Sequence, residues 1–282
     1  MLSPAIYFLA RGAGIQGIFP QLSRFDFTVY FSRTILLVLL ILILPGLRWM
    51  GFKNWHDLGL EKNLNWKRDW FCGMSLGSIL LGLTFAILFF VSPNIALDER
   101  FYFSRLFENL IAALLIAVIE ELLFRGVLFG ILRKQLNLAF ALTALSVFFA
   151  LIHFARPPQI GMAGENIFWY SGFFIITSLF EPCLHLGQIL GSFTTLFLVS
   201  AVLCYCVFKT NSLFFSMGLH AGWVFIIKSF QSAVVWRIQP TLWLGKDLRS
   251  GVVPIILIAL SGLLSYFIFN YFKKKEHAPR AI

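Results

Sequence analysis

Two glutamates and an arginine lie inside a long apolar stretch, residues 106–132. They are Glu120, Glu121 and Arg125, in the run Ile-Glu-Glu-Leu-Leu-Phe-Arg-Gly. A charge at the centre of a bilayer costs roughly 2.5 to 3.5 kcal/mol on membrane-insertion scales, so such residues usually have a partner or a function. On a helix, Glu121 and Arg125 share a face and are expected to pair, whereas Glu120 is rotated by about 100°. Glu120 is therefore the carboxylate available for proton transfer, since a carboxylate in a low-dielectric cavity is a better proton acceptor.

Two histidines lie in other apolar stretches, His153 in residues 138–154 and His220 in residues 213–230. At 1.5 Å per helical residue, Glu120 and His220 are each roughly 15 Å from the nearest basic turn, and His153 roughly 22 Å. All three can therefore meet near the middle of a membrane. A single membrane histidine usually serves as an interhelical hydrogen-bonding residue. Two histidines at matching depth with Glu120, the carboxylate outside the predicted Glu121–Arg125 pair, favour a catalytic site.

The same three side chains form a possible zinc ligand set, because two histidines and a glutamate hold many catalytic zinc ions. Glu120, His153 and His220 would be the ligands. They come from three separate helices, however, and lack the His-Glu-x-x-His spacing that places two ligands on one face. We therefore favour a site without metal or other cofactor, and keep zinc as the alternative.

The elements that must position these residues are membrane helices. The chain has 282 residues, of which 59% are hydrophobic and 13% charged. Its apolar runs reach the roughly 20 residues needed to cross a bilayer and lack the alternation of a membrane barrel. The sequence predicts an all-α polytopic bundle of about seven to eight transmembrane helices. The candidate spans are residues 30–44, 71–91, 106–132, 138–154, 167–180, 189–208, 213–230 and 252–272.

The candidate span 167–180 is short and ends at Glu-Pro, so it is either a full crossing or a broken, re-entrant piece. We divide the chain into an N-terminal interfacial segment (1–29), helices with an amphipathic connector (30–105), a core (106–230), and a last helix with a basic tail (231–282). The formal net charge of +10 comes from basic loops and the tail, as in a positive-inside membrane protein. We therefore expect no nucleic-acid partner.

Basic residues give a partly consistent topology. The loop 48–70, the turn with Arg133 and Lys134, and the tail at residues 273–275 are predicted to be cytoplasmic. A topology of seven full crossings with a re-entrant segment 167–180 places these three segments in the cytoplasm. It places the basic loop 237–249 on the non-cytoplasmic side of the membrane. The expected location is the plasma or inner membrane, as a multi-pass protein with the lipid bilayer as its surroundings.

The motif series resembles that of the CPBP family of intramembrane proteases, which includes CAAX prenyl endopeptidases and bacteriocin-processing, Abi-type proteins. The matching features are Glu-Glu-x-x-x-Arg at residues 120–125, Phe-x-x-x-His from Phe149 to His153, and a third helix bearing His220. In that family the third helix usually reads His-x-x-x-Asn or His-x-x-x-Asp, and Val224 occupies the last position here. The indole of Trp223 or a backbone N–H would have to replace the missing donor, or that contribution is absent.

The resemblance implies peptide hydrolysis with a glutamate-activated water. Glu120 would be the base, Glu121 and Arg125 a positioning pair, His153 would orient the water or share its proton, and His220 would donate to the carbonyl oxygen. Phe149 and Trp223 are expected to contact the substrate, which would be a prenylated tail, a leader peptide or another membrane-anchored peptide or protein.

Other functions fit the same residues. One is a non-proteolytic immunity or scaffold protein of this fold, which the valine at position 224 favours. Another is a proton-coupled transporter, although we find no inverted repeat and at most one broken helix. The two glutamates, the arginine and the two histidines are all energetically unfavourable inside a membrane. Their presence at one depth favours an enzyme over a scaffold protein.

Overall fold

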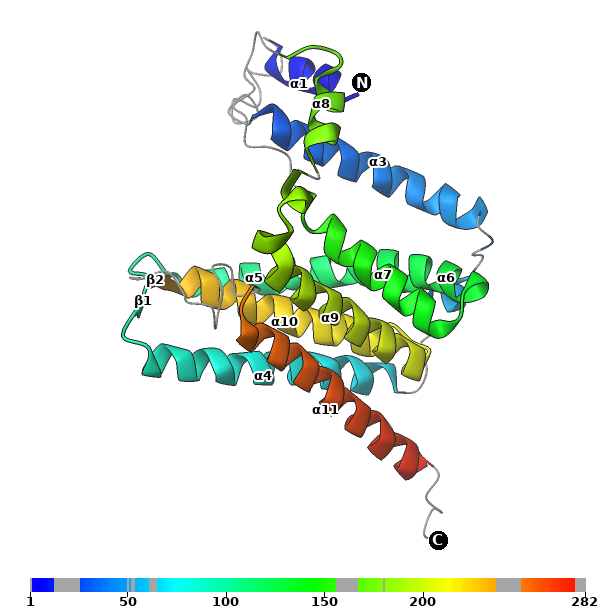
Figure 1. Cartoon of the computed structure of the whole chain (residues 1–282), viewed down its shortest axis with the longest axis vertical. Helices are drawn as coiled ribbons and strands as arrows, with labels where there is room; N and C mark the ends of the chain where they lie inside the picture. The colour runs from blue at the N-terminus through cyan, green and yellow to red at the C-terminus, as the bar shows by residue number, and fades with distance from the viewer. Residues whose placement is uncertain are drawn as a thin grey trace. The chain divides into compact units, whose positions relative to one another are not determined.

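The computed structural model describes residues 2–12, 26–49, 51, 54–60, 65–155, 167–179, 181–236 and 250–276 (Figure 1). The chain divides into two units, each treated separately below. Unit 1 comprises Met1–Lys53 and Leu151–Ile189, and unit 2 comprises Asn54–Ala150 and Leu190–Ile282. The predicted core 106–230 therefore contributes to both units.

Unit 1 contains α1 (Leu2–Arg11), α3 (Phe27–Trp49), α8 (Ser171–Ser178) and the short 3-10 helix η5 (Glu181–Leu184). Its core is aromatic: the Tyr7 ring lies edge-on to those of Phe27 and Tyr30, with centroids 5.6 and 5.3 Å apart. The doubtful span 167–180 forms only the eight residues of α8, a length of about 12 Å. Because a hydrocarbon core is about 30 Å thick, α8 does not cross it.

Unit 2 is a helical bundle. It holds α4 (Trp66–Val91), α5 (Ser104–Glu121), η3 (Leu122–Leu128), α6 (Phe129–Gln135), most of α7 (Leu138–Ile152), most of α9 (Leu186–Thr210), α10 (Phe214–Ala233) and α11 (Val252–Glu276). Within the described residues, three helices are long and apolar enough to cross a membrane: Trp66–Val91, Ile189–Thr210 and Val252–Lys273. The larger predicted number of crossings stays a prediction.

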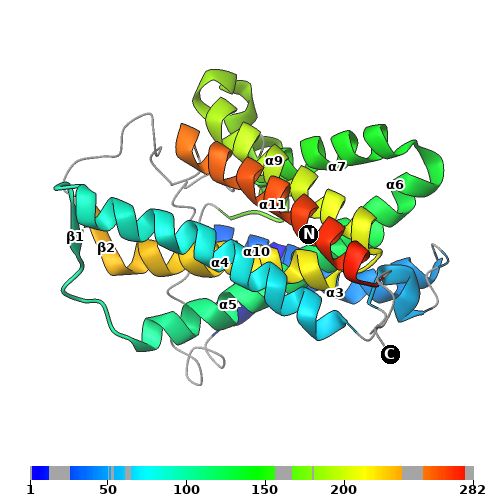
Figure 2. The ribbon, with the colours of Figure 1, turned by 90° about the horizontal axis from the view of Figure 1, so that it is seen from below.

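Helix α10 lies between α4 and α5 (Figure 2). Its contact with α4 is unusually close because glycines face each other there. A methyl group on Gly77 would lie 2.6 Å from the carbonyl oxygen of Leu219, and one on Gly222 would lie 2.6 Å from that of Met74. In the sequence, Gly218 and Gly222 are four residues apart, and small residues at this spacing on one helix face predict close helix packing. The structure confirms this prediction.

Helices α5 and α6 form one continuous rod with the segment η3 between them. The predicted helix 106–132 thus extends from Ser104 to Gln135. The sequence does not predict that Leu122–Leu128 is a π-helix. Such wide turns occur often at functional sites, and this one carries Arg125.

A two-stranded ribbon departs from the expected all-α fold. β1 (Ile95–Leu97) pairs antiparallel with β2 (Val234–Trp236), with Ile95 opposite Trp236. The two segments leave α4 and α10 at the same end of unit 2, and their β-branched and aromatic residues suit an extended backbone.

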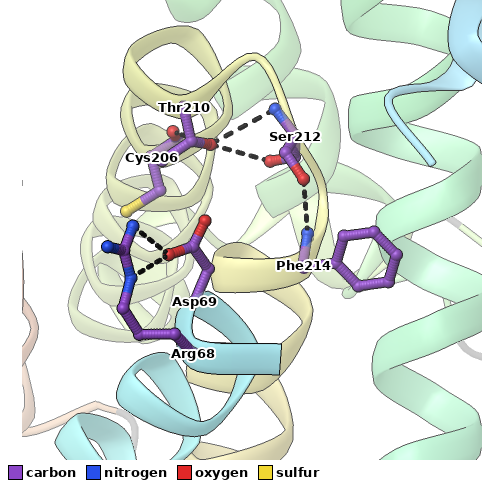
Figure 3. A network of polar contacts seen from close by, with 6 residues as sticks. All are labelled: Arg68, Asp69, Cys206, Thr210, Ser212 and Phe214. Atoms are coloured by element: carbon purple, nitrogen blue, oxygen red, sulfur yellow. Dashed lines mark hydrogen bonds and ion pairs between the residues drawn. The ribbon is translucent and has the colours of Figure 1, made fainter. Parts of the chain in front are cut away.

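A tight turn between α9 and α10 fixes where α10 begins (Figure 3). The Thr210 hydroxyl lies 2.9 Å from the carbonyl oxygens of Cys206 and Ser212, and the amide of Phe214 donates to the Ser212 hydroxyl at 3.3 Å. Asn211 has a φ of 48°, in the left-handed region that asparagine tolerates. This turn sets the register of α10 and hence the position of His220.

Candidate active site

Glu121 joins two helices of unit 2. Its Oε1 lies 3.0 Å from Nη1 of Arg125, one turn along the rod, and 2.9 Å from Nδ1 of His220 on α10. The Glu121 and Arg125 side chains are fully buried. The pairing predicted from the spacing of Glu121 and Arg125 is therefore confirmed. Because an ionised carboxylate only accepts hydrogen bonds, Nδ1 of His220 carries the proton in this contact.

His220 also approaches the other glutamate. Its Nε2 lies 3.9 Å from Oε2 of Glu120, whose side chain is 26% exposed. That distance is too long for a direct hydrogen bond, and Oε2 of Glu120 is itself buried. The two adjacent carboxylates thus differ: Glu121 is buried in a salt bridge, whereas Glu120 keeps an accessible edge, as the helical rotation between them predicts.

Aromatic rings enclose the Arg125 guanidinium. Its Cζ lies 4.5 Å from the ring centroid of Phe149, and the Phe149 ring packs edge-on against Phe124 at 4.9 Å. Among the described residues, Nε and Nη2 of Arg125 have no hydrogen-bond partner, so cation–π attraction compensates part of the buried charge. Phe149 is itself only 1% exposed. It supports Arg125, and its predicted contact with substrate stays a prediction.

His153 belongs to unit 1, whereas Glu120, Glu121 and His220 belong to unit 2. It is the first residue after α7, in a turn. The structure thus assembles two helices of the predicted three-helix site, and the place of His153 beside Glu120 stays a prediction.

Trp223 is 2% exposed and belongs to a core cluster with Leu81 and Phe85 of α4. Its Cδ1 lies 3.2 Å from the position of a methyl group built on Gly77. The indole therefore faces α4, whereas His220 faces α5. This packing gives Trp223 a structural role. Its predicted contact with substrate stays a prediction.

Two further side chains lie near enough to interact electrostatically with the buried pair and were not singled out in the sequence. They are Ser216, beside Glu121, and Cys204, beside Arg125. The Ser216 hydroxyl itself donates to the carbonyl oxygen of Leu213 at 3.0 Å. Ser216 precedes His220 by four residues and so shares its helix face, a spacing that could have indicated it. Cys204 comes from α9, and no local pattern relates it to Arg125.

The described residues include no group of three or more His, Cys, Asp or Glu side chains arranged to hold a metal ion. The zinc alternative also requires His153 beside the residues of unit 2. The choice between a metal-free and a zinc site stays a prediction.

Comparison with protein families gives a match to part of the chain. Residues 102–226 match the family of Rce1-like type II CAAX prenyl endopeptidases. This segment belongs to the CPBP/CAAX protease family. The CAAX-protease segment contains every predicted catalytic residue, and with its long apolar helices it supports an integral membrane protein with a protease fold. No curated protein and no solved structure gives a significant match to the chain.

Proposed function

We propose that the protein is an intramembrane endopeptidase that hydrolyses a peptide bond of a membrane-anchored peptide, with Glu120 as the general base. The observation that carries this proposal is the difference in surroundings between the two adjacent carboxylates. Glu121 is occupied by Arg125 and His220, while Glu120 lies 3.9 Å from Nε2 of His220 with an accessible edge. The CAAX-protease match supports the same reaction class.

In the proposed reaction, a water contacts Glu120 and attacks the scissile carbonyl carbon. Glu120 takes the proton of the water as the new C–O bond forms, and returns it to the leaving amine as the C–N bond breaks. The products are a carboxylic acid and an amine, and the acid then gives its proton to the amine to form carboxylate and ammonium. His153 is proposed to hold the water from the opposite side, as the family motif implies.

His220 is proposed to donate Nε2–H to the oxygen that becomes negative in the tetrahedral intermediate. Since Glu121 holds Nδ1–H, this role requires the imidazolium form, with both ring nitrogens as donors. Glu121 and Glu120, at 2.9 and 3.9 Å from the ring nitrogens, compensate that positive charge.

Val224 occupies the position of the family's amide side chain, one turn after His220 on the same face of α10. A valine side chain has no donor, so the proposed site has one oxyanion contact fewer. We expect a slow enzyme, because removal of one such donor typically lowers kcat on the order of 10² to 10³-fold.

The test is cleavage of a pool of membrane-anchored peptides by purified protein in lipid. The pool contains each peptide with and without a prenyl group. We expect the wild type to cleave and Glu120→Gln not to cleave, with activity surviving a chelator. Loss of activity on chelation would replace the glutamate-base scheme by the zinc scheme. No cleavage by folded wild-type protein across the pool would overturn the proposed function.

A further inference from the structure

A groove lies between α4 and α11 on the side of unit 2 away from Glu120. The groove is open to the surface and has a volume of about 480 Å³, within the roughly 300 to 1,000 Å³ of pockets that bind small molecules. Its walls are almost entirely apolar and include Leu76 of α4 and the aromatic residues Phe267, Tyr271 and Phe272 of α11. Such a groove suits a hydrocarbon chain.

The sequence concentrates basic residues in the two helix ends beside the groove. In Figure 2 the C-terminal part of α11 lies beside the N-terminal part of α4. Arg68 of α4 contacts Phe272 of α11, with its Cζ 4.0 Å from the ring centroid. These two helix ends carry five basic residues against the two acidic residues Asp69 and Glu276. The five are Lys67, Arg68, Lys273, Lys274 and Lys275.

The acidic residue Asp69 near the start of α4 is ion-paired. Nε and Nη2 of Arg68 both contact Oδ1 of Asp69, at 3.1 and 3.0 Å, and the Asp69 carboxylate is nearly buried (Figure 3). Arg68 thus pairs with Asp69 on α4 and covers the ring of Phe272 on α11. The net positive charge comes from the lysines, and Lys67 and Lys273 are exposed.

We propose that this groove binds one anionic phospholipid, with an acyl chain between α4 and α11 and the phosphate at the basic ends of both helices. The apolar groove matches the acyl chain of such a lipid, and the basic helix ends match its phosphate. Basic pockets between transmembrane helices bind anionic headgroups in other proteins. A peptide would be a poor occupant, because the walls offer few polar groups to its backbone. The groove is separate from the proposed hydrolytic site, so this inference does not rest on the proposed function.

The test uses delipidated full-length protein in detergent and measures lipid binding by native mass spectrometry. The probes are phosphatidylglycerol and phosphatidylcholine with identical acyl chains, and inorganic phosphate as a competitor. We expect phosphatidylglycerol to bind more tightly. Replacing Lys273, Lys274 and Lys275 together by glutamine should weaken it on the order of a hundredfold, at about 1 kcal/mol per charge.

Three controls separate this site from general charge attraction. The corresponding triple arginine variant keeps the charge and should retain binding. Arg105→Gln removes an exposed positive charge from the first turn of α5, at the opposite end of the bundle, and should leave binding unchanged. Ser75→Phe fills the groove from α4 and should weaken both lipids.

Equal affinity for the two lipids, or unchanged affinity in both the glutamine and Ser75→Phe variants, would overturn the proposal. Displacement of the lipid by millimolar inorganic phosphate would also overturn it, since it would show a phosphate site that does not use the groove.

Discussion

Oε1 of Glu121 accepts hydrogen bonds from Nη1 of Arg125 at 3.0 Å and from Nδ1 of His220 at 2.9 Å. One carboxylate oxygen therefore fixes the side chains of two helices, and the histidine ring is turned so that Nε2 faces Glu120. Four predictions follow from this geometry and from the packing that supports it.

Glu120→Gln should abolish cleavage with little effect on folding. An amide cannot take the proton of the water, and general base catalysis is typically worth 10² to 10⁴-fold, so kcat should fall by about that factor. The Glu120 side chain is partly exposed, so the unfolding temperature should stay close to that of the wild type. The matched control is Glu108→Gln, at an exposed position of the same helix. A Glu120→Gln protein with normal kcat would rule out Glu120 as the base.

Arg125→Met should destabilise the protein by up to about 3 to 5 kcal/mol, because it removes the arginine partner of the buried Glu121 carboxylate and leaves only His220 beside it. Glu121→Gln combined with Arg125→Met should recover part of that loss, since the uncompensated charge is then gone. Denaturant unfolding of the two single variants and the double variant measures the coupling. Additive losses would contradict the assignment of Glu121 and Arg125 as a pair.

Val224→Asn should raise kcat by at least about tenfold, because it adds a donor one turn after His220, where the oxyanion is proposed to form. KM should change less than kcat, since the new contact is made mainly in the transition state. Val224→Leu, a substitution without a donor, is the control. An unchanged or lower kcat in Val224→Asn would show that position 224 does not face the reacting carbonyl.

Gly222→Ala should lower both stability and activity. Its methyl group would lie 2.6 Å from the carbonyl oxygen of Met74, so α10 must move away from α4 and carry His220 with it. Overpacking of this kind typically costs about 1 to 3 kcal/mol.

Gly82→Ala on α4 is the control for that variant, because its nearest neighbour would be the Ile226 side chain at 3.7 Å. It should be neutral or slightly stabilising, since alanine favours a helix over glycine. Thermal unfolding and cleavage assays on both variants test the expectation. Equal stability of the two alanine variants would contradict the tight contact between α4 and α10.

The sequence by itself determined the features that depend on near neighbours. Apolar runs indicated membrane helices, the four-residue spacing predicted the Glu121–Arg125 pair, and the spacing of Gly218 and Gly222 predicted a close helix contact. The first follows from the length of apolar helix needed to cross a bilayer. The other two follow from the repeat of the α-helix, which brings residues three and four apart onto one face.

Only the tertiary structure decided the features that join distant segments. The hydrogen bond from His220 to Glu121 links residues 99 positions apart. The sequence predicted that His220 lies near Glu120, but it did not predict that Glu121 orients the imidazole ring. The π-helix at Leu122–Leu128, the pairing of β1 with β2 and the face of Trp223 turned toward α4 were likewise not predicted. Each depends on which helices pack together and at what rotation, and the periodicity of one helix does not specify its neighbour.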